Sequence, residues 1–328
     1  MKKTFQKTLI GAALVAAGLS AVAGTRPTTN LLFPYVTTAT GSYTFISIVA
    51  NQFGANPAAP FVHMTYATKA ISAANSAACA HLDGDAIMTA NDLMQFEIQN
   101  KVNMPAAFGD VTSVPKYFPL GAGANDRHGF LIVNNDAAAG GLYGGSAAYL
   151  NAALNGEAHI INTATGLGFG YSIDDLHTTG TNNPDFASTA GPDGGDPIKA
   201  ISWFPDPAVS TTWYVLPLGT ETTMGFGGNL TKTYKAYNWS GNIGGHYNNN
   251  EGFQSSTAQA AVTCLGVFDR ATLLGALNAP WSANGGWAAF APSVLPVLPG
   301  DNTLIYKMET TTALGGLRSF VSREPLFF

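Results

Sequence analysis

Short segments of alternating apolar and polar residues dominate this chain, and they predict β-strands. Residues 43–50 are rich in β-branched and aromatic side chains, and residues 61–68 alternate along their whole length. Pro34 interrupts the apolar segment 30–36, which is typical of an edge strand or the start of a strand. Further segments of this kind are residues 93–102, 129–133, 159–161, 168–171, 212–216, 261–267, 304–308 and 317–321.

Helical patterns are few. Ser146 has the character of an N-cap for a short helix through Leu154, with Gly156 as its stop, and Asp269 could cap a second helix that ends near Leu277. No alternation of strands with helices is present, which disfavours a parallel sheet. The sequence therefore predicts an all-β fold, mainly an antiparallel β-sandwich that is Ig-like in general architecture, with one or two short helices.

Residues 178–197 are rich in Gly, Asn, Asp, Thr and Pro, which indicates a long surface loop or a boundary between two sub-domains. The length of the chain permits one sandwich or two. The two cysteines, Cys79 and Cys264, lie on opposite sides of this segment. In an oxidising compartment they predict one disulfide, worth about 5 kcal/mol in the chain-entropy model.

The first 23 residues have the pattern of a bacterial secretory signal. Lys2, Lys3 and Lys7 precede a short apolar run, and residues 21–23 read Ala-Val-Ala, a small-residue cleavage site. We therefore expect a mature chain of residues 24–328 that is secreted or lies at the cell surface, with the periplasm as the alternative. No second long apolar run predicts a transmembrane segment.

Composition narrows the classes of partner. The whole chain has a formal net charge of −5 and only 11% charged residues, and loss of the three N-terminal lysines makes it more acidic. Nucleic acids and anionic lipids attract basic surfaces, so we expect neither as a partner. A neutral polar surface is typical of extracellular β proteins that avoid nonspecific binding. We expect the partner to be a protein or a glycan at the cell surface, or a second copy of the chain.

Three acidic residues suggest calcium. Asp83, Asp85 and Asp92 have the spacing of positions three, five and twelve of an EF-hand loop. The match fails at His81 and Ala86, where such a loop requires a carboxylate and a glycine. Turn-forming aspartates are the alternative, and Asp92 would then close a turn before Leu93. The acidic residues of the segment 174–196 leave the same two alternatives open.

Other candidate chemistry is weaker. Glu157 and Glu251 could form the paired carboxylates of a glycoside hydrolase, if the fold brings them together. Ser146 lacks the Gly-x-Ser-x-Gly context of a hydrolase nucleophile, and the six histidines show no zinc spacing. No catalytic constellation follows from the sequence.

Aromatic residues gather in the C-terminal half. Trp213 lies within an apolar strand and is expected in the core, whereas Trp239 and Tyr247 lie among Asn, Gly and Ser. Aromatic rings on a surface stack on sugar rings and anchor partners. Trp239 and Tyr247 are therefore the candidate ligand contacts.

Several short patches resemble one group of proteins. Residues 31–37 (Leu-Leu-Phe-Pro-Tyr-Val-Thr), followed by Gly41, Thr44, Ile46, Ile48 and Asn51, are similar to the opening of uncharacterised secreted bacterial proteins with the pattern FPYVT…G..T.I.I.N. Cys79, His81, residues 91–93, Phe96 and the segments 156–166 and 170–171 resemble later parts of the same proteins. The resemblance implies a surface-associated β-sandwich, makes Asn91-Asp92-Leu93 the entrance of a strand, and carries over no catalytic residue.

Three functions remain as expectations. The first is an exported β-sandwich protein with a structural or interaction role at the cell surface or in the matrix, including adhesion or self-assembly by edge pairing. The second is a carbohydrate-binding module, assisted by calcium. The third is a secreted glycoside or ester hydrolase.

Overall fold

The fold was analysed in a computed structural model of the chain. The structure describes residues 30–51, 61–99, 126–134, 154–164, 166–172, 199–205, 208–218, 231–237, 244–274, 284–292, 302–311 and 318–323. The predicted signal segment, the proposed boundary 178–197, Ser146 and Trp239 lie outside these residues. Within them the elements are antiparallel strands and one short helix, α3, which confirms the predicted all-β sandwich class.

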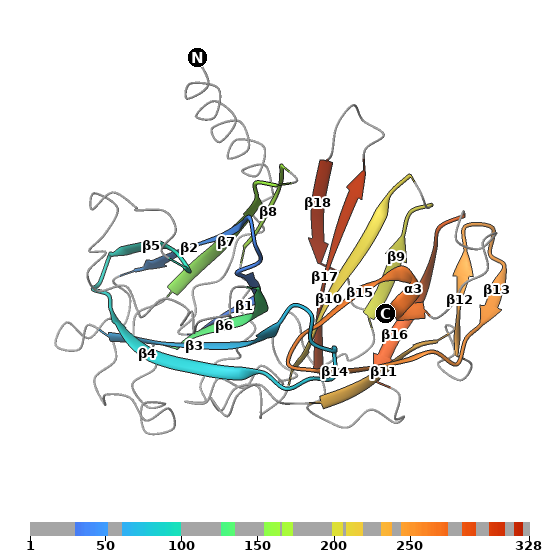
Figure 1. Ribbon diagram of the computed structural model, residues 1–328, viewed down its shortest axis with the longest axis horizontal. Coiled ribbons are helices and arrows are strands. Elements are labelled where there is room, and N and C mark those ends of the chain that lie inside the picture. Colours follow the sequence, from blue (N-terminus) through green and yellow to red (C-terminus); the bar gives the residue numbers. More distant parts are fainter. Residues whose placement is uncertain are drawn as a thin grey trace, which may run out of the picture.

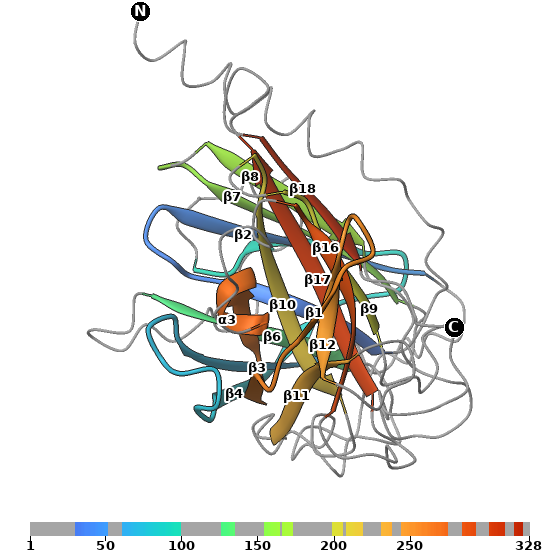
Figure 2. The same cartoon turned by 90° about the vertical axis from the view of Figure 1, so that its right-hand side faces the viewer.

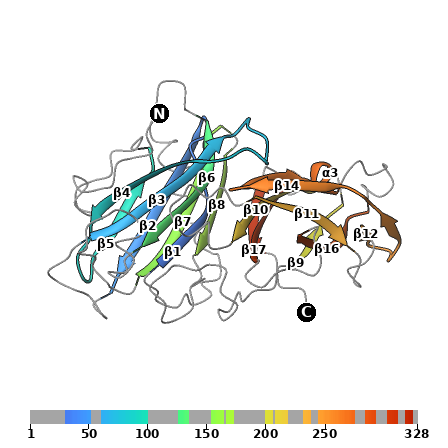
Figure 3. The same cartoon turned by 90° about the horizontal axis from the view of Figure 1, so that it is seen from below.

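The N-terminal strands form a first sandwich of two four-stranded sheets (Figures 1 and 3). One sheet has the order β1 (Asn30–Thr37), β6 (Arg127–Asn134), β3 (Phe61–Ala70) and β4 (Ala80–Ile87). The other has the order β5 (Leu93–Glu97), β2 (Ser42–Ala50), β7 (Leu154–Asn162) and β8 (Leu167–Ser172).

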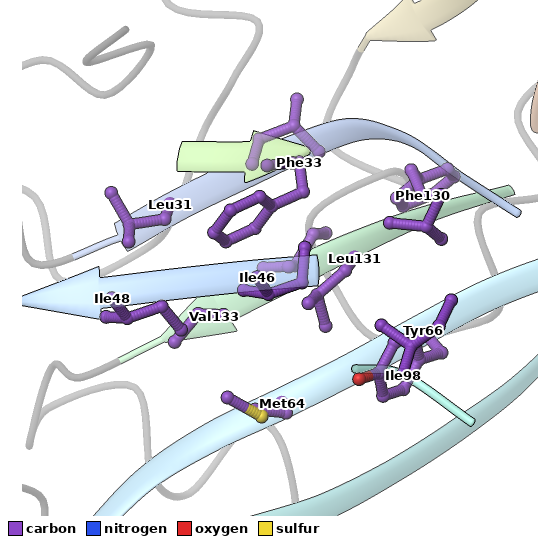
Figure 4. Close-up of a cluster of buried hydrophobic side chains, with 14 of the residues drawn as sticks. Leu31, Phe33, Ile46, Ile48, Met64, Tyr66, Ile98, Phe130, Leu131 and Val133 are labelled. Carbon is purple, nitrogen blue, oxygen red and sulfur yellow. The ribbon is translucent and has the colours of Figure 1, made fainter. Parts of the chain in front are cut away.

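Alternation along the strands creates the core between these sheets. The even-numbered residues of β2 are buried, while Tyr43, Phe45 and Ser47 are only half-buried. Ile46 and Ile48 therefore face apolar side chains of β1, β3 and β6 (Figure 4). Pro34 lies in β1, an edge strand, and the register with β6 shifts between Phe33 and Val36, as expected where a proline cannot donate a ladder hydrogen bond.

The C-terminal strands form a second sandwich. Its inner sheet has the order β15 (Gly266–Asp269), β10 (Ser210–Leu218), β17 (Asn302–Thr311) and β18 (Arg318–Arg323). Its outer sheet is built on β16 (Gly286–Pro292), which pairs with β9 (Lys199–Trp203) along one edge and with β12 (Gly245–Asn248) and β11 (Thr231–Tyr237) along the other. β13 (Phe253–Ser255) pairs with β12, and β14 (Gln259–Thr263) pairs with β11.

The inner sheet of the second sandwich contributes to both cores. Trp213 and Val215 of β10 pack with the C-terminal core, while Tyr214 and Leu216 pack with the N-terminal core. A strand buried on both faces reads as a continuous apolar run, which is what residues 213–216 show. The expectation that Trp213 lies in the core is confirmed, since its exposed fraction is 0%.

Two sequence-based expectations were wrong. Gly156 does not stop a helix but lies within β7, where β1 packs so closely that a Cβ atom would come within 2.9 Å of the Phe33 ring. Residues 261–267 do not form one strand, since Cys264 has a φ of 67° and separates β14 from β15. The second expected helix is present as α3 (Arg270–Leu274), and Asp269 caps it by accepting a hydrogen bond of 2.7 Å from the Thr272 N–H.

A covalent and polar junction joins β3 and the loop after it to the segment around Cys264. The predicted disulfide is present: Cys79 and Cys264 are bonded, with their Cα atoms 6.0 Å apart and a sequence separation of 185. The Asn75 side chain donates to the carbonyl of Val267 and accepts from its N–H, as a strand neighbour would. We call Lys69, Asn75, Cys79, Thr263 and Cys264 the junction.

Lys69 is the charged member of the junction. Its side chain is buried, and its Nζ donates to four backbone carbonyl oxygens, those of Ala74 (3.3 Å), Asn75 (2.7 Å), Ala77 (3.2 Å) and Thr263 (3.0 Å). Burial lowers the pKa of Lys69 to about 8, so the ammonium is the main form at neutral pH. A buried ammonium is tolerated because these oxygens replace water.

His128 lies opposite Lys69 in the ladder between β3 and β6 and is also buried. Burial, reinforced by the positive charges of Lys69 and Arg127, lowers the pKa of His128 to about 4. The imidazole is therefore neutral in the folded protein across the range in which a free histidine gains its proton.

Replacement of Lys69 by methionine should destabilise the fold by about 2–4 kcal/mol, because it leaves buried carbonyl oxygens without their donor. Urea denaturation of the oxidised protein measures this change. Lys235→Met, at a half-buried position on β11, is the control and should change stability by less than about 0.5 kcal/mol. Equal effects of the two substitutions would contradict the role of the junction.

Acid should weaken the fold through His128. Between pH 6.5 and 4 the unfolded chain binds a proton at this histidine and the folded chain does not, so stability falls as the pH falls through this window. Below pH 4 the free energy of unfolding has lost about 3 kcal/mol through His128. In denaturation measured as a function of pH, His128→Gln should flatten this part of the profile. An unchanged slope in the variant would show that His128 does not cause it.

Candidate functional site

Aromatic side chains form a row on one face of the outer sheet of the second sandwich. Phe253 on β13 pairs with Tyr247 on β12, and Tyr247 pairs with Trp287 on β16. Trp287 pairs in turn with Ser202 on β9. Residues directly opposite one another in a ladder point to the same face, so these four side chains lie side by side. We call Phe253, Tyr247 and Trp287 the aromatic row.

The rings of the row contact one another and reach solvent. The Tyr247 and Trp287 rings are stacked, with their centroids 4.8 Å apart and an angle of 16° between their planes. The centroids of the Tyr247 and Phe253 rings are 5.1 Å apart, and the angle between these planes is 54°. Phe253 is 37% exposed, while Tyr247 and Trp287 are half-buried. The end of the molecule with β9, β12 and β16 faces the viewer in Figure 2. The row is therefore a preformed apolar surface that a flat, apolar face of a ligand can contact.

A packed aromatic layer supports the row from the opposite face of the same strands. His246 on β12, next to Tyr247 in sequence, and Trp203 on β9, next to Ser202, are buried, and the centroids of their rings lie 5.8 Å apart. Trp203 packs edge-on against Trp213 of the inner sheet, with the ring centroids 6.2 Å apart. Burial lowers the pKa of the His246 imidazole, which keeps this layer neutral. Packing on a core fixes the positions of the exposed rings.

A tight turn sets the register between Phe253 and Tyr247. Asn248 Oδ1 accepts hydrogen bonds from the backbone N–H groups of Asn250 (2.9 Å) and Gly252 (2.8 Å), an Asx-type closure. Glu251 has a φ of 61°, in the left-handed region that such a turn uses. The acidic side chain proposed as a catalytic partner is thus part of the turn between β12 and β13.

A buried ion pair lies next to Ser202, the residue of β9 that is paired with Trp287. Lys307 Nζ donates to the Oγ atom (3.0 Å) and the carbonyl oxygen (3.3 Å) of Ser202, and it lies 3.5 Å from Oε1 of Glu309. Burial raises the pKa of Glu309, and the charge and hydrogen bond of Lys307 oppose that shift. These contacts tie β9 of the outer sheet to β17 of the inner sheet.

The structure places Tyr247, one of the two predicted ligand contacts, within the row. The other, Trp239, lies outside the described residues. Phe253, Trp287 and Ser202 were not among the predicted contacts, because cross-strand register depends on pairing between segments far apart in sequence. The polar run 248–252 was the available signal, since it indicates a turn that would bring Phe253 opposite Tyr247.

The backbone of the predicted calcium segment differs from that of an EF-hand loop. Asp83 and Asp85 lie within β4, which pairs residue by residue with β3, so this segment does not wrap around an ion as an EF-hand loop does. Asp92 closes a turn, accepting hydrogen bonds from the N–H groups of Thr89 (3.2 Å) and Leu93 (2.9 Å). Leu93 then begins β5, as the resemblance implied. Among the residues that the structure describes, no three His, Cys, Asp or Glu side chains form a group suited to a metal.

The fold does not bring the two proposed hydrolase carboxylates together. Glu157 lies on β7 of the first sandwich, and Glu251 lies in the turn at the far end of the second (Figures 1 and 3). Glu157 has its own neighbour, since its Oε1 lies 3.5 Å from Nε2 of His159 on the same face of β7. Glu157 and Glu251 therefore cannot act on one glycosidic bond within one chain.

Neither protein-family models nor curated proteins match the chain. In the described part of the chain, no helix has the length and apolar character needed to cross a membrane.

The geometry of the row depends on close contact between β12 and β16. A Cβ atom at Gly286 would lie 2.1 Å from the carbonyl oxygen of Tyr247 and 2.7 Å from the Trp203 ring. Gly286→Ala should therefore destabilise the protein by roughly 1–3 kcal/mol and change the near-ultraviolet circular dichroism of the stacked rings.

Gly168→Ala on β8 is the matched control, because its nearest contact would be an ordinary 3.6 Å. Thermal denaturation and circular dichroism measure both variants. If Gly286→Ala behaves like Gly168→Ala in both measurements, β12 and β16 are not packed as described.

Proposed function

We propose that this protein is an exported β-sandwich protein that acts at the cell surface or in the extracellular matrix by binding. The aromatic row carries the proposal: stacked rings that reach solvent lie on a sheet that packs on the C-terminal core. Exposed aromatic residues that cluster on a rigid scaffold are typical of binding surfaces. Export is supported by the N-terminal signal pattern and by the disulfide, which is stable outside the cytoplasm.

The row also favours carbohydrate binding as a second and more specific candidate. Tyr247 and Trp287 offer apolar ring surface beside the hydroxyl group of Ser202. A sugar ring has one apolar face and a rim of hydroxyl groups, so it matches an aromatic surface with polar neighbours. This candidate does not need calcium at Asp83, Asp85 and Asp92, whose segment is a strand and a turn.

Hydrolase function has weaker support. The pair Glu157 and His159 is the nearest approach to an acid–base couple on the exposed face of the first sandwich. A nucleophile–histidine–acid relay needs the acid and the nucleophile on different ring nitrogens. Glu157 lies beside Nε2, the nitrogen that would face a nucleophile, while Nδ1 is buried with no hydrogen-bond partner in the part of the chain described. Binding is the function that the geometry supports better.

The test is binding of the mature, oxidised chain to cells, to extracellular matrix and to an array of purified glycans. Tyr247→Ala and Trp287→Ala should each weaken binding by about tenfold, the loss expected for one aromatic stacking contact. Leu93→Ala, an exposed apolar position on the first sandwich, is the control and should bind as the wild type does.

Three outcomes separate the candidates. Loss of glycan binding in the Tyr247 and Trp287 variants supports the carbohydrate candidate. Binding to matrix or cells with a blank glycan array, and with the same loss in these variants, supports a protein partner. A strictly monomeric chain in size-exclusion chromatography that binds none of the three would contradict the proposed function.

A further inference from the structure

The hydroxyl group of Ser202 lies at the end of the line of side chains that begins with the aromatic row. Ser202 is exposed and lies directly opposite Trp287 in the ladder between β9 and β16, so both side chains are on the same face of the sheet. Among the described strands, β9 pairs only with β16. A ligand that contacts Trp287 therefore lies next to the Ser202 hydroxyl group.

A buried cation determines how this hydroxyl group can bond. Lys307 Nζ donates to Ser202 Oγ over 3.0 Å, and an ammonium group has no lone pair with which to accept a hydrogen bond in return. The Ser202 proton is repelled by the ammonium and points away from it. Within the described residues, Ser202 Oγ has Lys307 as its hydrogen-bond partner and donates to no acceptor. The hydroxyl group is therefore left as a donor for a bound molecule.

The surroundings of Lys307 make Ser202 a strong but uncharged donor. The side chains of Lys307 and Glu309 are 9% and 4% exposed, and Nζ lies 3.5 Å from Oε1. A hydrogen bond from a buried ammonium polarises the O–H bond of the hydroxyl group that accepts it. The formal charges of the two side chains cancel, and the rings of the aromatic row are neutral. This surface therefore matches a neutral ligand that carries acceptor oxygens.

The length of the line defines the size of that ligand. The line from Phe253 to Ser202 crosses β13, β12, β16 and β9. Neighbouring strands lie about 4.8 Å apart, so the three intervals span roughly 14 Å. A single sugar ring covers only part of this length. An oligosaccharide that crosses the strands can contact the aromatic row and place an oxygen atom at Ser202.

We propose that this surface binds an extended neutral oligosaccharide that runs across the strands from Phe253 to Ser202, and that Ser202 determines specificity by donating a hydrogen bond to it. Lys307 is a positioning residue that acts through Ser202. The inference deepens the carbohydrate candidate above and rests on it. It adds the length and charge class of the ligand and one directed polar contact.

The experiment is isothermal titration calorimetry of the mature oxidised protein with cellohexaose, laminarihexaose, xylohexaose and chitohexaose. At least one should bind, and about tenfold or more tightly than the methyl glycoside of the same sugar, because further ring contacts add to the binding free energy. Ser202→Ala should weaken this binding about tenfold through loss of a charge-assisted hydrogen bond. Ser202→Thr keeps the hydroxyl group and should retain most of the affinity.

A matched control separates the hydroxyl contact from general effects of removing a serine. Ser47 is half-buried on β2 of the first sandwich, and its Oγ accepts a hydrogen bond of 3.4 Å from Nε2 of Gln95. Ser47→Ala therefore removes a similar hydroxyl group far from the aromatic row. It should leave the affinity for the hexasaccharide unchanged.

A double-mutant cycle tests the role of Lys307. Lys307→Met combined with Glu309→Gln removes the ion pair without leaving either charge buried alone. In this background Ser202→Ala should weaken binding by clearly less than in the wild type, because the hydroxyl group is no longer polarised. An equal loss in both backgrounds would show that Lys307 only stabilises the fold.

The possible failures are distinguishable. Unchanged binding in Ser202→Ala, with loss in Tyr247→Ala and Trp287→Ala, would refute the role of Ser202 and keep the carbohydrate candidate. A methyl glycoside that binds as tightly as its hexasaccharide would refute the extended ligand, and preference for a charged chain such as oligogalacturonate would refute the neutral class. Absence of binding by all four hexasaccharides would overturn the inference, and a blank glycan array as well would refute the carbohydrate candidate.

Discussion

Burial of both faces of the β10–β17 sheet is the constraint on which the rest of the structure depends. On one face Trp213, Val215 and Ile305 belong to the C-terminal core, and on the other Tyr214 and Tyr306 belong to the N-terminal core. Each sandwich therefore uses a layer that the other also requires. Removing either sandwich would expose a large apolar surface to water, at roughly 25 cal/mol per Å². The two sandwiches are one cooperative packing unit for this reason.

The junction extends this dependence to polar chemistry. An apolar interface between two sandwiches is non-directional and would tolerate sliding, whereas hydrogen bonds and a disulfide fix one geometry. The ammonium of Lys69 meets carbonyl oxygens from the loop after β3 and from Thr263, so it is satisfied only when the two segments are in register. The Cys79–Cys264 bond keeps the same segments together in the unfolded chain, which lowers the entropy lost on folding.

The candidate binding surface arises from this rigid frame. The aromatic row is ordered because Trp203 and His246 pack beneath its strands and connect it to Trp213. A side chain on a packed sheet loses little further freedom when a ligand binds. Rings held in this way bind with a small entropic cost.

The sequence by itself determined the local features of this protein. Alternation of apolar and polar residues identified β2 and β3, the apolar run of β10 placed Trp213 in the core, and Asp92 and Asp269 were recognisable as turn and cap residues. Strands such as β4 and β16 were missed because glycine, alanine and charged residues occupy them, and their burial comes from neighbouring strands. The presence of only two cysteines, together with the predicted signal segment, was enough to predict their bond. Only the tertiary structure decided that Lys69 is buried among carbonyl oxygens, and that Phe253, Tyr247 and Trp287 lie side by side. Each of these depends on pairing between strands distant in sequence, whereas propensities and turn signals act over a few residues.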